Sequence, residues 1–359
     1  MSPRRRSDPP YPLSRRGFLG AGGSAALLCT LGAGKTVEDA TPRDIDRADN
    51  YAARLKKPAS AQAAGAGPGD APQPQPGGVK REYWIAARSL KWDVAPTGQD
   101  EWMRTKIRGP RTFRALVYQR YSTGFGEPIG AAGMPGPTLE GEVGDTIVVH
   151  FRNADERLNQ ALTVHPHGVR YTPQYDGSYL GLFTLAGGFV APGEEFTYTW
   201  ECTPDSVGVW PYHDHGPNHT LNTMRGLFGA VIVREKGAPR PDVEVVQVMH
   251  SFPPNVTKLR RLFHAINGRS FAGNTPTVHA RVGQEVAWHV FGGDGNFHTF
   301  HVHGHRWRDA AGTFVDNPSF GPNEQITARW REDNPGRWLY HCHVFQHQDA
   351  GMAGWYLVE

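Results

Sequence analysis

Histidines recur in this sequence as four pairs, each with one residue between the two imidazoles. The pairs are His165 with His167, His213 with His215, His301 with His303, and His341 with His343. Successive residues of a β-strand point to opposite faces of a sheet, so the two members of a pair point the same way. Imidazole is a ligand for zinc, copper, iron and nickel, and eight imidazoles on four strands could hold a cluster of metal ions.

The fourth pair encloses a cysteine, which adds a second kind of site. Cys342 would point to the opposite face of its strand from His341 and His343. The residues that can join it there are His298, His347 and Met352. Two histidines, a cysteine and a weak axial methionine form the ligand set of a blue copper site. One strand could thus connect an electron-accepting copper with a metal cluster on its other face.

Over residues 81–359 these segments resemble the multicopper oxidases, specifically the small two-domain laccases of bacteria. The resemblance rests on the order and spacing of all four pairs and on the His-Cys-His…His…Met run near the C-terminus. It implies copper as the cofactor, at about four ions per chain: one type 1 copper, one type 2 copper and a type 3 pair.

The resemblance also assigns the ligands. The type 1 copper would be bound by His298, Cys342, His347 and Met352, and the type 2 copper by His165 and His301. The type 3 pair would be bound by His167, His213, His215, His303, His341 and His343. The remaining seven histidines are expected to be structural or at the surface: His150, His219, His250, His264, His279, His289 and His305.

The resemblance implies an enzyme that takes single electrons from phenolic or aromatic amine donors at the type 1 copper and reduces O2 to water at the cluster. Oxygen reduction also consumes protons, and the family places an acidic residue near the type 2 copper, here Asp176. Tyr171 stands where related small laccases have a redox-active tyrosine. From the residues alone, Asp176 could equally belong to an Asp-Gly turn and Tyr171 could be a packed tyrosine.

Two other activities stay open. A ferroxidase would oxidise a metal ion and would need carboxylates beside the type 1 histidines, for which Asp294 and Asp349 are candidates. The segment Tyr83-Trp84-Ile85-Ala86-Ala87 looks ceruloplasmin-like. A copper nitrite reductase is less favoured, because it does not need the three-copper cluster for which this chain keeps eight histidines. The physiological donor depends on loop shapes that the sequence does not reveal.

The elements that must position these ligands are predicted to be short strands between Gly- and Pro-containing turns. The predicted strands are 146–151, 195–200, 227–233, 243–249, 285–290, 325–331, 336–341 and 354–358. A weak internal repeat relates Val143-Gly144-Asp145-Thr146-Ile147 to Val282-Gly283-Gln284-Glu285-Val286. We predict an all-β protein of two Greek-key β-sandwiches, which the resemblance makes cupredoxin-like. They would cover residues 81–237 and 238–359, and only the second would carry a type 1 site, because Asp214 replaces the cysteine in the first.

The N-terminal part differs in composition from the remainder. Residues 1–34 contain Ser14-Arg15-Arg16-Gly17-Phe18-Leu19 before an apolar stretch, which predicts a twin-arginine signal, its export machinery as a partner, and a secreted or extracytoplasmic location. Residues 35–80 are polar and rich in Pro, Ala and Gly, which predicts a disordered spacer. The first 80 residues hold 12 Lys/Arg and 7 Asp/Glu, so the body carries a formal charge of −2 and shows no footprint for nucleic acid. Cys202 has no predicted partner and is expected to be a buried small side chain.

Assembly follows from the need for both domains at one cluster. Each sandwich contributes four histidines, while the linker at 235–241 is short and holds two prolines. The related small laccases form a ring of three chains in which each first domain meets the second domain of a neighbour. The resemblance therefore implies a homotrimer with intermolecular clusters.

Overall fold

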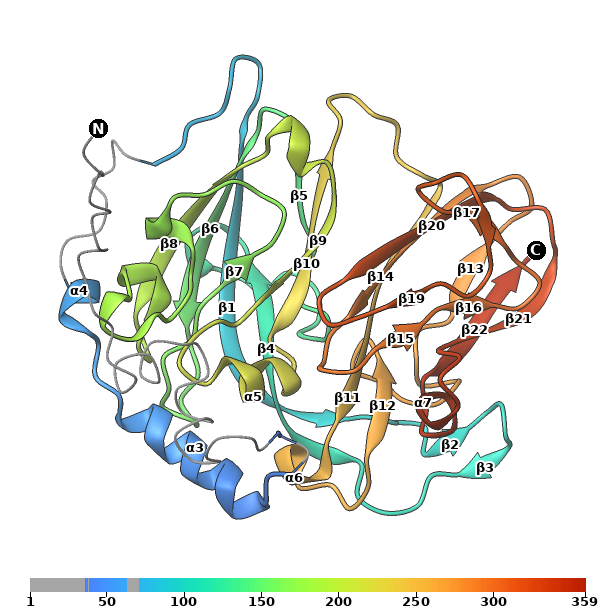
Figure 1. Cartoon of the computed structure of the whole chain (residues 1–359), viewed down its shortest axis with the longest axis horizontal. Coiled ribbons are helices and arrows are strands. Elements are labelled where there is room, and N and C mark those ends of the chain that lie inside the picture. The colour runs from blue at the N-terminus through green and yellow to red at the C-terminus, as the bar shows by residue number, and fades with distance from the viewer. Residues whose placement is uncertain (1–35, 38, 63–70) are drawn as a thin grey trace, which may run out of the picture.

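The structure, a computed structural model, describes residues 36, 37, 39–62 and 71–359; the predicted twin-arginine region 1–34 lies outside them. Two β-sandwiches lie side by side (Figure 1), built from residues 80–234 and 243–358. The predicted all-β class with two β-sandwich domains is confirmed, and the structure is mostly β with some short helices. The chain crosses from one sandwich to the other between Arg234 and Val243.

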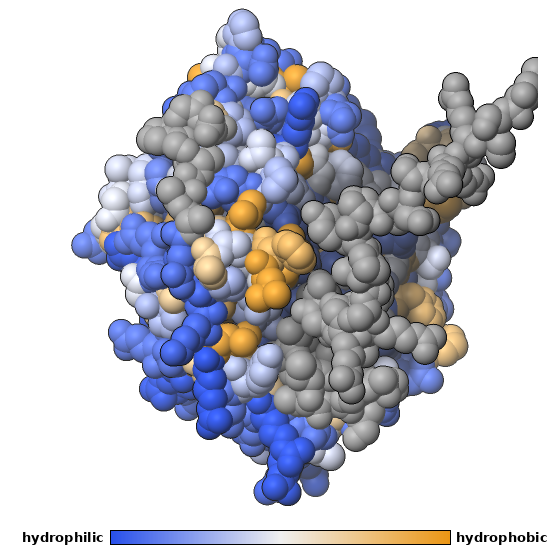
Figure 2. Space-filling view, turned by 60° about the vertical axis from the view of Figure 1, so that its left-hand side comes forward, coloured by the Kyte–Doolittle hydropathy of each residue, from blue (hydrophilic) through white to orange (hydrophobic). Residues whose placement is uncertain are grey.

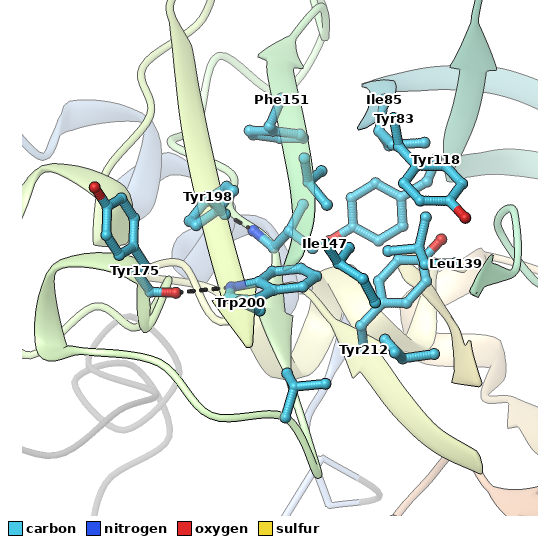
Figure 3. Close-up of a cluster of buried hydrophobic side chains, with 14 of the residues drawn as sticks. Tyr83, Ile85, Tyr118, Leu139, Ile147, Phe151, Tyr175, Tyr198, Trp200 and Tyr212 are labelled. Atoms are coloured by element: carbon cyan, nitrogen blue, oxygen red, sulfur yellow. Dashed lines mark hydrogen bonds between the residues drawn. The ribbon is translucent and has the colours of Figure 1, made fainter. Parts of the chain in front are cut away.

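The first sandwich has two four-stranded sheets. One has the order β4-β1-β6-β8, formed by β4 Thr112–Tyr121, β1 Lys80–Asp93, β6 Thr146–Asn153 and β8 Glu195–Glu201. The other has the order β5-β10-β9-β7, formed by β5 Leu139–Glu142, β10 Phe228–Arg234, β9 Gly208–His213 and β7 His165–Pro166. Alternate residues fill the space between the sheets, among them Ile147, Phe151, Tyr198 and Trp200 (Figure 3). Cys202 is buried in the same core as a free thiol.

The second sandwich repeats this topology. One sheet has the order β12-β11-β14-β20, formed by β12 Phe263–Ile266, β11 Val243–Phe252, β14 Glu285–Gly292 and β20 Gln325–Arg331. The other has the order β13-β22-β21-β16, formed by β13 Val278–Ala280, β22 Ala353–Val358, β21 Gly336–His341 and β16 His301–Val302. β11 runs parallel to β14 as β1 does to β6, and β13 runs parallel to β22 as β5 does to β10. All eight predicted strands are present, with ends within three residues of the prediction.

Shorter elements connect the strands. The two-stranded sheets pair β2 Gln99–Asp100 with β3 Thr105–Lys106, β15 His298–Thr299 with β19 Ser319–Phe320, and β17 Trp307–Arg308 with β18 Phe314–Val315. Short α-helices are α5 His219–Met224, α6 Pro254–Thr257 and α7 Phe345–Asp349. The 3-10 turns are η2 Thr123–Phe125, η3 Pro173–Tyr175, η4 Gly181–Phe183, η5 Ala186–Gly188 and η6 Pro204–Ser206.

An apolar interface fixes the two sandwiches to each other. Phe113 of β4 packs on Phe252 of β11 with ring centroids 4.8 Å apart. Apolar side chains of β9 and β10 belong to the same buried cluster as those of β11, β12 and β14. At the rim, Arg234 forms ion pairs with Glu140 of its own sandwich and Glu244 of the other. Burial of apolar surface therefore sets the position of the two domains within one chain.

The prediction that residues 35–80 form a disordered spacer is wrong for two helices in this segment. Helix α3 spans Pro42–Arg54, and helix α4 spans Ala59–Gln62. The start of α3 carries a signal that the composition hid: the side chains of Thr41 and Asp44 form a capping box. The buried face of α3 consists only of Ile45 and two alanines, so the sequence shows no clear helical pattern of apolar residues. A helix with so small an apolar face is stable only when it packs against another surface.

That partner surface comes from both domains. Ile45 is buried against Leu221 of α5 and Val256 of α6, which belong to the first and second sandwich respectively. Asp49 forms a two-pronged ion pair with Arg225, at 2.6 and 2.8 Å. Helix α3 thus contacts both domains; Figure 1 shows it below the first sandwich, with one end beside α6. None of the helices in the described part of the chain is long and apolar enough to span a membrane.

Candidate metal centres

Four predicted ligands lie together at one edge of the first sandwich. β7 and β9 pair antiparallel with His165 opposite His213. The ring centroid of His165 lies 5.1 Å from those of His167 and His215 and 5.6 Å from that of His213. The two pairs therefore converge on one space, and we call these four residues the first-domain histidines.

Backbone carbonyls orient these rings. Nδ1 of His165 lies 2.6 Å from the carbonyl oxygen of Asp176, and Nδ1 of His213 lies 2.8 Å from that of Asp214. An imidazole whose Nδ1–H donates to a carbonyl presents Nε2 as its free lone pair, which is how metal-binding histidines are commonly held. Nε2 of His167 faces Nε2 of His213 at 3.0 Å, so these nitrogens point into the shared space.

The second sandwich repeats the arrangement with His301, His303, His341 and His343, the second-domain histidines. β16 pairs with β21 so that His301 lies opposite His341. Nδ1 of His301 lies 2.7 Å from the carbonyl oxygen of Asp316, and Nε2 of His303 faces Nε2 of His341 at 3.1 Å. The ring of His343 lies 5.2 Å from that of His341.

A glycine ends each histidine segment on β7 and β16 for a steric reason. Gly168 and Gly304 have φ angles of +69° and +75°, which glycine adopts at little cost. A Cβ on Gly168 would come within 1.9 Å of the Trp210 indole, and one on Gly304 within 2.9 Å of the Trp338 indole. The tight turn and the packed tryptophan together position the second histidine of each pair.

Three of these histidines are held neutral near pH 7. Burial, followed by the nearby His165, lowers the pKa of His167 to about 4. Burial also lowers the pKa of His213 well below its ordinary value and that of His341 to about 4. A neutral imidazole keeps the lone pair that a metal needs, so this environment fits metal ions.

Cys342 lies in the core of the second sandwich, where it meets the other predicted type 1 ligands. Its Sγ lies 3.9 Å from Nδ1 of His298 and 3.7 Å from Nδ1 of His347. Met352 is fully buried in the same core, and its carbonyl accepts from the Cys342 N–H at 3.2 Å. Two metal–ligand bonds of about 2.0–2.3 Å that meet at one ion span separations of this size. The sulfur and the two nitrogens can therefore share one ion.

The surroundings of Cys342 favour its thiolate. Burial alone would raise the pKa of this thiol, but His298 and His347 lower it to about 6. The buried carboxylate of Asp294 accepts from Nε2 of His298 at 3.0 Å, which keeps Nδ1 directed toward the sulfur. Burial lowers the pKa of His298, but Asp294 outweighs this and raises it to about 9.

Asp176 and Tyr171 lie beside His165. Oδ1 of Asp176 is 3.1 Å from Nδ1 of His165, and the Tyr171 ring centroid is 6.0 Å from that of His165. Burial alone would raise the pKa of Asp176, but His165 and Ser178 lower it. Burial and the hydrogen-bonded Asp176 raise the pKa of Tyr171 to about 12. An ionised carboxylate thus touches both a predicted ligand and a protonated phenol.

Two histidines that sequence reasoning left without a role stack on predicted ligands. His219 lies 4.4 Å from His215, and His264 lies 4.1 Å from His347, as ring centroids. His219 had a signal in the sequence: it follows Asp214 by five residues, the interval that separates the second-domain cysteine from its histidine. His264 comes from β12, and no spacing points to it.

The first-domain and second-domain histidines lie in different parts of the chain. β7 and β16 lie in separate sandwiches (Figure 1). Within the described residues, two groups of three or more potential ligands have all their ligand atoms within 4.8 Å of one another. They are His298 with Cys342 and His347, and His301 with His303 and His341, and both lie in the second sandwich. The part of the second sandwich that faces His167 across a groove of about 450 Å³ contains Phe320 and Glu324. His303 and His343 are exposed.

The fold and these groups define a protein of two cupredoxin-like sandwiches. A family model described as multicopper oxidase matches residues 129–238, and a second model with the same description matches residues 239–359. A solved structure titled as a multicopper oxidase aligns with a TM-score of 0.62 at 26% identity, covering 78% of this chain and 89% of that one. The predicted cupredoxin-like fold is confirmed. The chain belongs to the multicopper oxidase family.

Curated relatives with different printed names share this similarity. The "Probable nitrite reductase-hydroxylamine oxidoreductase fusion protein" of Kuenenia stuttgartiensis is 31% identical over 248 residues, which cover 63% of this chain and 28% of that protein. The human "Ferroxidase HEPHL1" is 28% identical over 348 residues, which cover 79% of this chain and 30% of that protein. The chain spans less than a third of the length of these relatives.

Proposed function

We propose that this protein is an extracytoplasmic oxidase that takes single electrons from small phenolic or aromatic amine donors and reduces O2 to water. The observation that carries the proposal is that the buried group of Cys342, His298 and His347 is joined, through neighbouring residues of one strand end, to the second-domain histidines. The link is His341-Cys342-His343, in which the sulfur and the two imidazoles face different sites.

Copper is the metal that this donor set suits. A thiolate, two imidazoles and a buried thioether match a type 1 copper, and eight imidazoles match a type 2 copper and a type 3 pair. When bound, these ions would supply one-electron acceptance at one site and electron delivery to O2 at the other. We assign His298, Cys342, His347 and Met352 to type 1, His165 and His301 to type 2, and the other six paired histidines to type 3.

The side chains around Cys342 determine where a donor can approach. His298 is fully buried and its Nε2 is engaged by Asp294, whereas His347 is 9% exposed. Phe345 is 68% exposed and stands two residues from His347, in the same short helix α7. An aromatic donor would therefore dock at the α7 side, where an apolar ring is available for contact.

Asp176 is placed to supply protons. Its carboxylate is half-buried, ionised, and in contact with His165 and the Tyr171 hydroxyl. A carboxylate of this kind can take a proton from water and release it toward oxygen held beside His165. We propose this role for Asp176 and a supporting electron-donor role for Tyr171.

We further propose a homotrimer in which the first-domain histidines of one chain meet the second-domain histidines of the next. Support comes from the separation of the two groups within the chain and from the exposure of His303 and His343. Apolar side chains also gather on the face that carries α4 (Figure 2), where Leu182 and Phe183 are 86% and 72% exposed. This loop follows Tyr179, whose N–H donates to the His215 carbonyl, so it lies close to the first-domain histidines.

Complementation between two inactive variants tests the trimer. One variant carries His165→Ala and His167→Ala, and the other carries His341→Ala and His343→Ala. After dissociation and co-assembly, intermolecular clusters require part of the oxidase activity to return, because some interfaces pair two intact groups. Clusters within one chain require none, and full activity at single-chain mass would also exclude the trimer.

Oxygen uptake by copper-loaded protein tests the activity. With a phenolic donor we expect O2 consumption without accumulation of hydrogen peroxide, and metal analysis should give about four coppers per chain. One copper per chain in fully loaded protein would contradict the cluster assignment. Uptake that yields peroxide instead of water would contradict the proposed reaction.

A ferroxidase is the second candidate, because the human relative carries that name. Of the two carboxylates that could serve a metal-ion donor, Asp294 is closed in the core beside His298, while Asp349 is exposed two residues after His347. Ferrous and phenolic donors compared in one oxygen-uptake assay, with Asp349→Ala, separate the two activities. Nitrite offered as the electron acceptor without O2 tests the third, less favoured activity.

A further inference from the structure

Glu332 is the centre of a buried polar group in the core of the second sandwich. It is 1% exposed, and its carboxylate accepts hydrogen bonds from the Tyr356 hydroxyl, from Nε2 of His305 at 3.0 Å, and from the Trp330 indole at 2.8 Å. Burial alone would raise the pKa of Glu332, but these donors lower it. Glu332 is therefore an ionised carboxylate near neutral pH, hydrogen-bonded to the buried Tyr356 phenol.

The first sandwich is apolar at the equivalent positions. The N–H of Glu332 donates to the Gln284 carbonyl as that of Cys202 donates to Asp145, which makes Glu332 and Cys202 equivalent. The same strand registers place Val231 where the second sandwich has Tyr356, and Val169 takes the place of His305. A packed core thus does not need this polar group, and its presence calls for another role.

Aromatic rings connect Tyr356 with a predicted copper ligand. The Tyr356 ring lies 5.5 Å from Trp288, and Trp288 lies 4.9 Å from Tyr340, as ring centroids. Tyr340 directly precedes His341 in β21. In the other direction, Trp330 lies 6.1 Å from Tyr356 and is partly exposed. Rings in van der Waals contact allow an electron to move in short steps between His341 and the surface.

We propose that Tyr356 and Glu332 form a redox-active pair, which supplies an electron to the oxygen-reducing site when external donor is scarce. This inference rests on the proposed oxidase activity, which would provide the oxidant. The pair would protect the protein, because a reactive oxygen species would be reduced before it oxidises the histidines that surround the oxygen-reducing site.

The step conserves atoms and charge. Tyr356 would lose one electron through Trp288 and Tyr340 toward the metal centre that His341 would help to hold, where O2 would be the oxidant, and its hydroxyl proton would pass to Glu332. A neutral tyrosyl radical and a neutral carboxylic acid remain. An external one-electron donor at the Trp330 side then returns the electron, and Glu332 returns the proton.

The acceptor of the hydroxyl proton distinguishes Tyr356 from the tyrosines in the core of the first sandwich. Three of those hydroxyls donate to backbone carbonyls: Tyr118 to Thr163 at 2.6 Å, Tyr198 to Gly187 at 2.7 Å and Tyr212 to Pro137 at 2.7 Å. Figure 3 shows where these three tyrosines lie in the core. A carbonyl oxygen is too weakly basic to keep the proton of an oxidised phenol, whereas a carboxylate can keep it. Tyr171 with Asp176 is a second tyrosine–carboxylate pair, so a test of Tyr356 has to remove the Tyr171 hydroxyl first.

Photo-oxidation of the metal-free full-length chain tests the pair without any copper. In a Tyr171→Phe background, a flash-excited ruthenium complex with persulfate oxidises the protein, and frozen samples are examined for a tyrosyl radical by electron paramagnetic resonance. We expect Tyr356→Phe and Glu332→Gln each to lower the long-lived signal at least about fivefold, because either change removes the proton transfer. Tyr118→Phe is the matched control and should keep the signal.

A signal that is unchanged in Tyr356→Phe, or equally lowered in Tyr118→Phe, overturns the proposal. If Tyr356→Phe does not fold, as judged by near-UV circular dichroism, Glu332→Gln decides by the same signal, since it keeps the tyrosine ring. In copper-loaded protein starved of donor under O2, we expect Tyr356→Phe to be inactivated at least about threefold faster, with unchanged donor oxidation when donor is in excess. Failure of O2 reduction in the unaltered protein would contradict the proposed function, while the photo-oxidation result would still judge the pair.

Discussion

The two sandwiches share one topology but differ at the place where the second holds its cysteine. Strand pairing and spacing make four positions equivalent, and the first sandwich has Leu162, Asp214, His219 and Leu227 where the second has His298, Cys342, His347 and Met352. Three of the four predicted type 1 ligands are thus replaced by residues that do not form a blue copper site. The histidine pairs on the neighbouring strands are kept in both sandwiches.

In the first sandwich, a chain of hydrogen bonds connects Asp214, at the position of Cys342, with the N-terminal helix α3. The buried Asp214 accepts from the Thr163 N–H at 2.8 Å and from the Asn222 side chain at 3.1 Å. Asn222 lies in α5 close to Arg225, whose guanidinium binds Asp49 of α3. The two sandwiches thus keep the same strands because their cores require them, whereas a few substitutions replace the proposed electron-transfer site by a polar network that connects to helix α3.

Replacement of the cysteine should give the largest effect. We expect Cys342→Ser to abolish the blue absorption and to lower donor oxidation by about a thousandfold or more, because the thiolate is the defining ligand of the type 1 site. Copper analysis should still find about three ions per chain, since the paired histidines are unchanged. Asp214→Ser is the matched control in the first sandwich and should keep the blue band. Retention of that band in Cys342→Ser would disprove the ligand assignment.

Asp176 and Asp316 provide the second comparison, because each accepts from Nδ1 of a paired histidine through its backbone carbonyl. Asp176 also has its carboxylate at His165, whereas Asp316 is exposed. We expect Asp176→Asn to slow reoxidation of the reduced protein by O2 about a hundredfold, and Asp316→Asn to change it less than about twofold. Stopped-flow measurement of the two half-reactions checks this, and equal slowing of donor oxidation would indicate structural damage instead.

A repeated Glu-His contact offers a comparison of stability. Glu244 contacts His289 and Arg234 at the domain boundary with its side chain 16% exposed, whereas Glu82 contacts His150 with its side chain 47% exposed. Burial alone would raise the pKa of Glu244, but His289 and Arg234 lower it to about 2 from an ordinary 4.5. Because the folded-state pKa is the lower one, the ionised group stabilises the fold fully above pH 4.5 and progressively less as the pH falls toward 2.

The shift corresponds to about 3 kcal/mol at neutral pH. We therefore expect Glu244→Gln to lower the free energy of unfolding at pH 7 by an amount of this order, and Glu82→Gln by less than about 1 kcal/mol. Chemical denaturation at pH 7 and pH 3 measures both. If the cost of Glu244→Gln did not shrink at pH 3, the ionised carboxylate would not be its cause.

The smallest effect is expected at the axial position, where the first sandwich has Leu227. Met352→Leu should keep the blue absorption and raise the reduction potential, since the thioether is a weak ligand that tunes the site. A redox titration of the copper-loaded variant checks this against the unaltered protein. Complete loss of the type 1 copper would show that the thioether is required for binding.

Local pattern was enough to predict the strands and to name the side chains that converge within each sandwich. Residues two apart on a strand share a face, so the spacing of His341, Cys342 and His343 already separated the sulfur from the imidazoles. Runs of β-branched and aromatic residues between Gly- and Pro-containing turns predicted eight strands, because such side chains favour the extended backbone and glycine and proline favour turns. The same sequence also contains the interval that makes His219 equivalent to His347, a signal that the ligand motifs alone do not bring out.

Features that depend on partners distant in sequence needed the tertiary structure. Helix α3 carries too few apolar residues to be visible alone, and it exists because two domains supply Leu221 and Val256 to cover Ile45. Glu332 stands between Arg331 and Asp333 in the sequence, yet the fold buries it directly after β20, against Tyr356. Spacing within a strand is a local property, whereas burial and the partners of a carboxylate depend on which strands become neighbours, and that choice is made by the packing of the whole core.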